Sequence, residues 1–386
     1  MKNKILVSIL LFCLCGYIKI KAQEVANIQK TTINSKILNQ KRPILIYTPQ
    51  GYDDNTLSSY DVIYVFDSQN REEFDLVHSL IGFLDFSKKF IVVGICSPYY
   101  KETNYSRPND YLPKPINVSY YQQTKNPNSD NFWKYVTEEV FPFINSKYRT
   151  TNNKYAIGHS LSASFIIDKF INSTNVFRGY IAVSPNFAYD EYRLASEFSK
   201  FDINSLKENK FLYTSQSDEY KTMPEQWNIG YEKFKKYISQ KQEFGKLTLI
   251  NKEFPEENHW GVYLPSLTFG LKNLNTFIQN NPEKPNGVFQ TITINVKTLN
   301  KDDEVYIVGN QESLGNWNPS KIKMNKISDF QRTITLKVQF PLEFKITRGD
   351  WKTEGATNEN DGDNILISKP IKSKVINLKV IQWFDK

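Results

Sequence analysis

The chain has 386 residues, of which 40% are hydrophobic and 23% are charged, and its formal net charge is +8. Four of these positive charges are Lys2, Lys4, Lys19 and Lys21, so the rest of the chain carries about +4, with its lysines dispersed among Asn, Asp and Glu. A modest, unclustered charge gives little support to nucleic-acid binding. The length is sufficient for two domains.

The first 22 residues have the pattern of a secretory signal peptide. Early lysines precede an apolar run from Ile5 to Ile18, and the small residue Ala22 follows. The run is shorter than the roughly 20 residues that span a bilayer, and no later stretch comes close, so we expect a secreted or periplasmic protein without a membrane span. Cleavage leaves Cys96 alone among three cysteines, so no intramolecular disulfide is expected.

Short apolar runs alternate with helical patterns over residues 31–280. Continuous apolar runs predict strands buried on both faces, and helices are predicted at residues 74–86 and 132–144 and after His259. Strands are predicted at residues 44–47, 62–66, 90–95, 155–157, 180–183, 211–213 and 247–250. This order predicts an α/β fold with a mostly parallel sheet. The polar segment 97–130, which contains Arg107, has no clear period and is interpreted as a functional insertion or a mobile flap.

Ser160 lies where a short apolar strand turns into an apolar helical pattern. Gly158 and Ser162 are the small residues two positions before and after it, which approximates the G-x-S-x-G nucleophile elbow. The elbow needs small residues there because strand and helix approach closely around the strained serine. The alternative is an ordinary strand-to-helix turn.

A serine nucleophile needs a base, and the chain has three histidines. His159 is in the elbow itself, next to the serine, where its side chain is directed away from Ser160. His78 lies in an apolar helical stretch and is interpreted as a packed or surface residue. His259 follows the last predicted strand of this region in a polar loop, and is the predicted base.

The chemical order Ser160, Asp218, His259 is that of the α/β-hydrolase triad. Asp218 and Glu219 are adjacent, so only one can face the histidine; Asp218 is favoured, and Glu219 stays open. The expected oxyanion hole uses the backbone N–H of Leu161 and one from the loop after residues 62–66, from Ser68 or else Gln69.

No metal or other cofactor is expected. One mature cysteine and three scattered histidines offer no zinc spacing. The acidic cluster at residues 360–363 does not fit the calcium-loop pattern and is interpreted as a turn.

Six segments, in order, carry a family resemblance: RPILIYTPQGY, DVIYVFDSQN, FIVVGI, VFPFINSKYRT, YAIGHSLSASF and ENHWGVYLPSLTFGLKNL. They resemble the putative esterase family of α/β-hydrolases, which is related to siderophore esterases, feruloyl esterases and S-formylglutathione hydrolase. The resemblance covers roughly Val25 to Asn280, and it implies an acid after the strand at 211–213. Ser162 and Ser68 stand where this family usually has glycine.

The pattern changes after residues 281–287, a stretch with prolines and a glycine that is the predicted linker between a hydrolase domain at 23–280 and a module at 288–386. Alternating apolar residues predict strands at 291–296, 305–308, 333–340, 344–346 and 375–381, and no helix. The module is therefore predicted to be an all-β sandwich.

Within the module, VYIVGNQESLGNWNP and FPLEFKITRGDWKTEGATNENDGDN resemble the family 20 carbohydrate-binding, or starch-binding, modules. By that resemblance Trp317, Lys345 and Trp351 match positions that line a sugar site. An aromatic ring can stack on the apolar face of a pyranose. The alternative is that the two tryptophans pack the edge of the sandwich.

The sequence therefore predicts a secreted serine hydrolase that cleaves a carboxylic ester through an acyl-enzyme on Ser160, with a module that binds polysaccharide nearby. A siderophore trilactone esterase is the alternative substrate class. A second alternative is a carbohydrate-binding protein whose hydrolase domain is weakened at Ser162 and Ser68.

Overall fold

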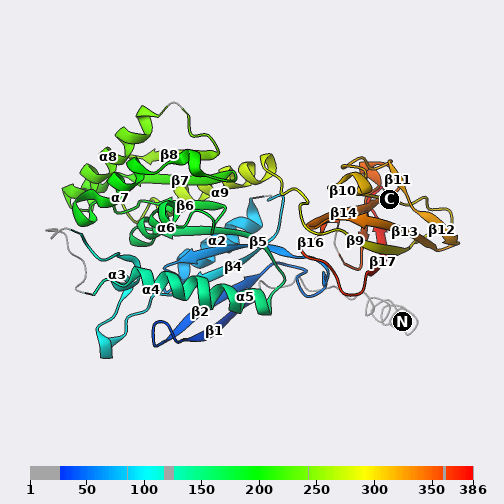
Figure 1. The fold of residues 1–386 in the computed structure, drawn as a ribbon, viewed down its shortest axis with the longest axis horizontal. Helices are drawn as coiled ribbons and strands as arrows, with labels where there is room; N and C mark the ends of the chain where they lie inside the picture. The colour runs from blue at the N-terminus through cyan, green and yellow to red at the C-terminus, as the bar shows by residue number, and fades with distance from the viewer. Residues whose placement is uncertain (1–26, 85, 117–125, 242, 360–361, 386) are drawn as a thin grey trace, which may run out of the picture.

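The computed structural model describes residues 27–84, 86–116, 126–241, 243–359 and 362–385. The predicted signal peptide, residues 117–125 of the polar segment and residues 360–361 of the acidic cluster lie outside these ranges. Figure 1 shows an α/β part formed by the N-terminal two thirds of the chain and a β part formed by the rest.

Eight of the described strands form one sheet in the order β1-β2-β4-β3-β5-β6-β7-β8. β1 and β2 pair antiparallel, as do β2 and β4, and every other pair is parallel. The strands are β1 (Asn27–Ser35), β2 (Gln40–Thr48), β3 (Tyr60–Phe66), β4 (Phe90–Ile95), β5 (Thr150–His159), β6 (Gly179–Val183), β7 (Lys210–Ser217) and β8 (Leu247–Phe254). The predicted α/β fold with a mostly parallel sheet is confirmed.

Helices cover both faces of the sheet because its central strands are apolar on both sides. In β3, Val62, Tyr64 and Phe66 join one core, and Ile63 and Val65 join the other. Helices α2 (Arg71–Phe83) and α9 (Tyr263–Asn280) pack on the second face. The first face is covered by α4 (Ser129–Lys134), η3 (Tyr135–Val140), α5 (Phe141–Lys147), α6 (Leu161–Asn172), α7 (Tyr189–Lys200) and α8 (Glu225–Gln240). Across the described ranges, none of the helices combines the length and apolar character that crossing a membrane requires.

The polar segment after β4 is anchored to the sheet by buried ionic contacts. It contains the short 3-10 helix η2 (Lys101–Thr103) and the short α-helix α3 (Arg107–Tyr111). Asp110 of α3 accepts a hydrogen bond from Arg42 of β2 at 2.5 Å, and both side chains are fully buried. The Tyr105 hydroxyl donates to the same carboxylate at 2.6 Å. These contacts explain how a segment without periodicity keeps a defined place beside the sheet.

The C-terminal part is a sandwich of two sheets, which confirms the all-β prediction. One sheet has the order β11-β10-β14-β16 and the other the order β12-β13-β9-β17-β15. Their facing apolar side chains form a separate core that includes Ile294, Phe344 and Trp383. The strands are β9 (Gln290–Lys297), β10 (Tyr306–Gly309), β11 (Ile322–Lys323), β12 (Asn325–Ser328), β13 (Gln331–Val338), β14 (Leu342–Thr347), β15 (Gly355–Thr357), β16 (Ile365–Ile367) and β17 (Val375–Trp383). The short turns η6 (Glu312–Leu314) and η7 (Trp351–Thr353) lie between strands.

Candidate active site

Ser160 occupies a strained turn between β5 and α6. Its backbone has φ 63° and ψ −119°, a conformation that a side-chain-bearing residue seldom adopts. A Cβ added at Gly158 would lie 2.7 Å from the carbonyl carbon and oxygen of Ser162, so the close approach of strand and helix requires glycine there. The local geometry is that of a nucleophile elbow.

Ser162, which stands where the family usually has glycine, is accommodated without an unpaired polar atom. Its hydroxyl accepts a hydrogen bond from the His159 N–H at 3.0 Å and donates to the His159 carbonyl at 2.9 Å. The side chain is fully buried. The Ser162 hydroxyl therefore stabilises the turn by bridging the backbone N–H and carbonyl of His159.

His259 is paired with Glu219 inside the protein. Nδ1 of His259 lies 2.8 Å from Oε2 of Glu219, and neither side chain is exposed. The Ser217 hydroxyl donates to the other carboxylate oxygen at 2.7 Å. Glu219 begins the turn η5 (Glu219–Lys221), directly after Asp218 and the end of β7.

Asp218 points elsewhere. Its carboxylate is partly exposed and lies 3.5 Å from the Lys221 amine on the same turn, and its N–H donates to the Glu257 carbonyl. The prediction that Asp218 faces the histidine is therefore wrong, and Glu219 takes that place. The physical reason is the tight turn after β7, which directs the first carboxylate to the surface and the second inward. The i, i+3 pairing of Asp218 with Lys221 is the one sequence signal for this outcome.

The two groups shift each other's ionisation. Burial alone would raise the pKa of the Glu219 carboxyl, but hydrogen bonds from His259 and Ser217 hold it below its ordinary value. Burial lowers the pKa of His259, although the Glu219 carboxylate opposes this effect. The pair therefore favours a neutral imidazole beside a carboxylate, which is the state in which a histidine accepts a proton.

His159 links the elbow to the histidine loop. Its Nε2 lies 2.9 Å from the backbone carbonyl of His259, and the two imidazole rings stack with centroids 4.9 Å apart. Its other ring nitrogen lies 3.6 Å from a carboxylate oxygen of Glu73 on α2. The residue before Ser160 thus fixes the loop that carries His259, a role that the sequence analysis did not assign.

Nε2 of His259 is buried and has no hydrogen-bond partner within the part of the chain that the structure describes. Trp227 packs edge-on against its ring at 5.0 Å, and Trp260 does so at 5.2 Å. Catalytic hydrogen bonds are often long before substrate binds. The open nitrogen is the one that a general base needs.

The loop after β3 is predicted to supply one oxyanion-hole N–H, from Ser68 or else from Gln69. The Ser68 N–H donates to the Ile95 carbonyl at 3.1 Å, so the predicted use of Ser68 is wrong. The Gln69 N–H, the alternative, has no partner within the described residues, and neither does the N–H of Leu161 at the start of α6. Ser68 itself fits because its side chain lies against the Cβ-free face of Gly94.

Arg107 of α3 holds this loop against the elbow. Its guanidinium forms two hydrogen bonds of 2.8 Å to the Asp67 carboxylate and a third, of 3.2 Å, to the His159 carbonyl. The Gln69 amide also donates to Asp67, and its oxygen accepts from the Ser97 N–H, both at 2.8 Å. The polar segment 97–116 therefore supports the site, although the sequence offered only an isolated arginine.

His78 and Cys96 have structural roles. His78 of α2 is buried, lies 3.1 Å from Asp75 and stacks on Tyr47, so of the two interpretations, a packed or a surface residue, the packed one holds. Cys96 is buried directly after β4. Among the residues described, no three His, Cys, Asp or Glu side chains gather to hold a metal ion.

The three predicted sugar-site residues lie around β10 and β14 of the module. Lys345 of β14 is paired with Glu354 at 2.7 Å. Trp351 begins the turn η7, three residues before Glu354, and is 43% exposed. Trp317 is half-buried, and its backbone N–H donates to the carbonyl of Gly309 at the end of β10. The preceding residue of β10, Val308, is the strand partner of Lys345 in β14. Lys345 and Trp351 thus share one neighbourhood, and neither tryptophan joins the fully buried core.

Comparisons with known proteins agree with this architecture. The family model described as "Putative esterase" matches residues 35–242, and the one described as "Starch binding domain" matches residues 289–375. A comparison with curated proteins gave no match.

Solved structures with the same fold are distant in sequence. An IroE-like serine hydrolase from Shewanella oneidensis is 22% identical with a TM-score of 0.54, over 65% of this chain and 80% of that one. The siderophore hydrolase EstA from Aspergillus nidulans is 17% identical with a TM-score of 0.55, over 68% and 98%. A ferulic acid esterase is 13% identical with a TM-score of 0.51, over 66% and 99%.

At these identities the structural likeness establishes the fold alone. The esterase family model, however, covers more than half of the 386 residues. The chain therefore belongs to the putative esterase family, and it is a carboxylic ester hydrolase with a C-terminal module of the starch-binding type.

Proposed function

We propose that the protein is a secreted or periplasmic serine hydrolase that cleaves a carboxylic ester, on or near a carbohydrate, through an acyl-enzyme on Ser160. The observation that carries this proposal is the buried His259–Glu219 pair, whose ring stacks on His159, the residue before the strained Ser160, and whose second imidazole nitrogen has no partner among the described residues. His159 joins the two by its contact with the His259 carbonyl.

In the proposed mechanism, the Ser160 hydroxyl attacks the ester carbonyl while Nε2 of His259 takes its proton. Glu219 holds the imidazole through Nδ1 and stabilises the imidazolium. The N–H groups of Leu161 and Gln69 stabilise the charge on the former carbonyl oxygen. His259 then returns the proton to the leaving alcohol.

The acyl-enzyme is resolved by water. His259, neutral again, takes a proton from the attacking water and then donates it to the Ser160 oxygen as the bond between that oxygen and the acyl carbon breaks. The products are the carboxylic acid and the free serine.

The module supplies the carbohydrate part of the proposal. The starch-binding family match covers residues 289–375 of it, and Trp351 exposes an aromatic face of the kind that stacks on sugar rings. Binding to a polysaccharide would keep the hydrolase near esters carried on or around that polymer.

A siderophore-type ester is the second candidate, and one observation favours it. Trp260 is 64% exposed and packs edge-on against both His259 and His159, so a planar aromatic group could rest on it near the reacting carbonyl. Two structural neighbours are named siderophore hydrolases. Comparing aryl and acetyl esters on the wild type and on Trp260→Ala separates these substrate classes.

The alternative of a catalytically weak binding protein loses its main support. It rested on Ser162 and Ser68, and both are accommodated: the Ser162 hydroxyl is hydrogen-bonded on both sides, and Ser68 fits against Gly94.

The test is hydrolysis of short-chain nitrophenyl esters by the purified protein. Ser160→Ala and His259→Ala should each lower kcat/KM by several orders of magnitude. Ser199→Ala, on the exposed side of α7, and His78→Ala, on α2, are the matched controls and should retain activity. Normal turnover by a folded Ser160→Ala protein would end the assignment.

A further inference from the structure

The module is joined to the hydrolase by a defined set of hydrogen bonds. The Ser59 N–H donates to the Leu366 carbonyl of β16 at 2.7 Å, and the Ser368 hydroxyl donates to the Ser59 hydroxyl at 3.0 Å. The Glu359 carboxylate accepts from the Thr56 hydroxyl at 2.9 Å and from the Leu57 N–H at 3.1 Å. Leu57 also packs against the core of the module.

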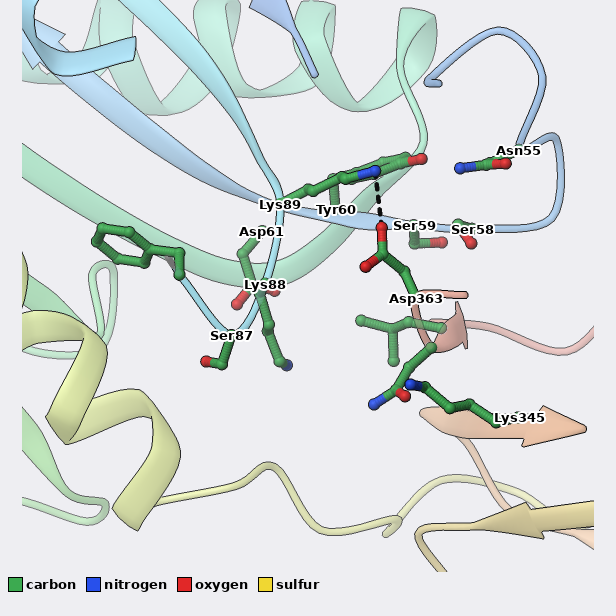
Figure 2. A pocket seen from close by; sticks show the side chains of 13 residues that line it. Asn55, Ser58, Ser59, Tyr60, Asp61, Ser87, Lys88, Lys89, Lys345 and Asp363 are labelled. Atoms are coloured by element: carbon green, nitrogen blue, oxygen red, sulfur yellow. Dashed lines mark ion pairs between the residues drawn. The ribbon is translucent and has the colours of Figure 1, made fainter. Parts of the chain in front are cut away.

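Beside this junction lies a cavity of about 340 Å³ that both parts of the chain line. Figure 2 shows the loop before β3 and the loop before β4 on one side, and β14 with the segment before β16 on the other. The hydrolase contributes polar groups from Asn55, Ser58 and Lys88, and the module contributes Lys345 and Asn364. The volume is in the range of small-molecule sites.

The charges of this cavity are balanced. Lys89 is paired with Asp363 at 2.7 Å, as the dashed line in Figure 2 marks, and Lys345 is paired with Glu354 at 2.7 Å. Burial would lower the pKa of Lys88, but the carboxylates of Asp61, Glu343 and Glu283 raise it above its ordinary value. Since each ammonium group has carboxylates beside it, little positive charge is left to attract a phosphate or a sulfate.

The remaining lining suits a neutral, hydroxyl-rich ligand. Hydroxyl, amide and ammonium groups from both walls offer donors and acceptors, while Phe86 and Leu366 add apolar surface. A sugar presents this combination of hydroxyls and apolar C–H faces. The Asn364 amide is held in place by a hydrogen bond of 2.6 Å to Glu343.

We infer that this cavity is a saccharide-binding site built jointly by the hydrolase and the module, extending the proposed sugar site at Lys345 onto the hydrolase. The inference rests on the polysaccharide binding proposed above. Lys345 belongs both to the cavity, which it lines, and to the predicted sugar site of the module, where it pairs with Glu354 near Trp351.

The site is an anchor and not part of the reacting centre. Its hydrolase residues lie at the amino ends of β3 and β4, whereas Ser160, Glu219 and His259 follow the carboxyl ends of β5, β7 and β8. The seven residues of β3 span about 20 Å at ~3.3 Å per residue. A sugar held here cannot be the ester under attack, so the anchor serves a polymer chain.

The test is affinity electrophoresis of the full chain in native gels that contain soluble starch. Lys88→Ala on the hydrolase wall and Asn364→Ala on the module wall should each weaken retardation about fivefold, the factor for one lost hydrogen bond. Lys272→Ala, at an exposed lysine on α9, is the matched control and should bind as the wild type does. Hydrolysis of a small soluble ester should be unchanged in all three.

Each outcome has a distinct meaning. If Trp317→Ala and Trp351→Ala weaken retardation but Lys88→Ala and Asn364→Ala do not, the joint site is overturned while the proposed binding by the module stands. If starch does not retard the wild type, both carbohydrate proposals are overturned, and the Ser160 assay still decides the esterase. Thermal melting of each variant verifies that it is folded. If Lys88→Ala is not folded, Asn364→Ala alone tests the joint site.

Discussion

At the scale of single residues, the pairing of His259 with Glu219 depends on where the backbone turns after β7. Ser217, Asp218 and Glu219 are consecutive, and only the last of them reaches the imidazole. The order of serine, acid and histidine along the chain could be predicted because each follows a recognisable strand. For the choice between the two neighbouring carboxylates, the only sequence signal is the i, i+3 spacing of Asp218 and Lys221, because the turn geometry has no periodic pattern.

Replacement of the two carboxylates separates their roles. Glu219→Gln should lower kcat by about 10²–10⁴, because the imidazole loses the group that orients it and stabilises its charged form. Asp218→Asn, which removes a carboxylate directed at Lys221, should leave kcat near the wild-type value. Steady-state kinetics on a nitrophenyl ester measure both, and the reverse ranking would refute the assignment of Glu219.

The pH profile reports on the same pair. Protonated His259 cannot act as a base, and its pKa is lowered by burial, so kcat/KM should rise with pH through a midpoint below about 6.5. The Glu219 carboxylate raises the pKa of His259, so the residual activity of Glu219→Gln should have its midpoint at still lower pH. A midpoint that moves upward in this variant would contradict the account.

At the scale of elements, the continuous apolar runs predicted the central strands because buried parallel strands have no polar face. Helix α8, whose apolar face is narrow (Trp227, Tyr231 and Phe234), and α7 were not predicted. Strands β15 and β16 have three residues each, too few to show alternation, and their pairing with β17 and β14 comes from the folded sandwich.

The close approach of strand and helix at the elbow requires glycine at position 158, and this requirement can be tested. Gly158→Ala should cost about 1–3 kcal/mol of unfolding free energy, the range for overpacking, because the new methyl group would meet the Ser162 backbone. Gly82→Ala, in α2, is the matched control: its added Cβ meets nothing within 4 Å, and it should stabilise by about 0.5–1 kcal/mol. Urea unfolding measures both. Equal effects of the two substitutions would show that the close packing at the elbow is not required.

At the scale of the whole molecule, the two predicted functions lie at opposite edges of one sheet. The candidate catalytic residues follow the carboxyl ends of the strands, and the module attaches near the amino ends of β3 and β4. The sequence indicated both parts through separate motifs. It could not indicate the cavity between them, because the lining residues come from four stretches, 55–61, 86–89, 345 and 363–366, that only the folded chain brings together.

The central claim is that Ser160 carries the acyl group, and rapid acid quench with mass spectrometry tests it directly. During turnover of nitrophenyl butyrate, trypsin should release residues 155–169 as one peptide with one added butyryl group on Ser160. Ser160→Ala should give neither the adduct nor turnover. Hydrolysis at the wild-type rate with no acyl group on this peptide, or with the group on another residue, would contradict the account.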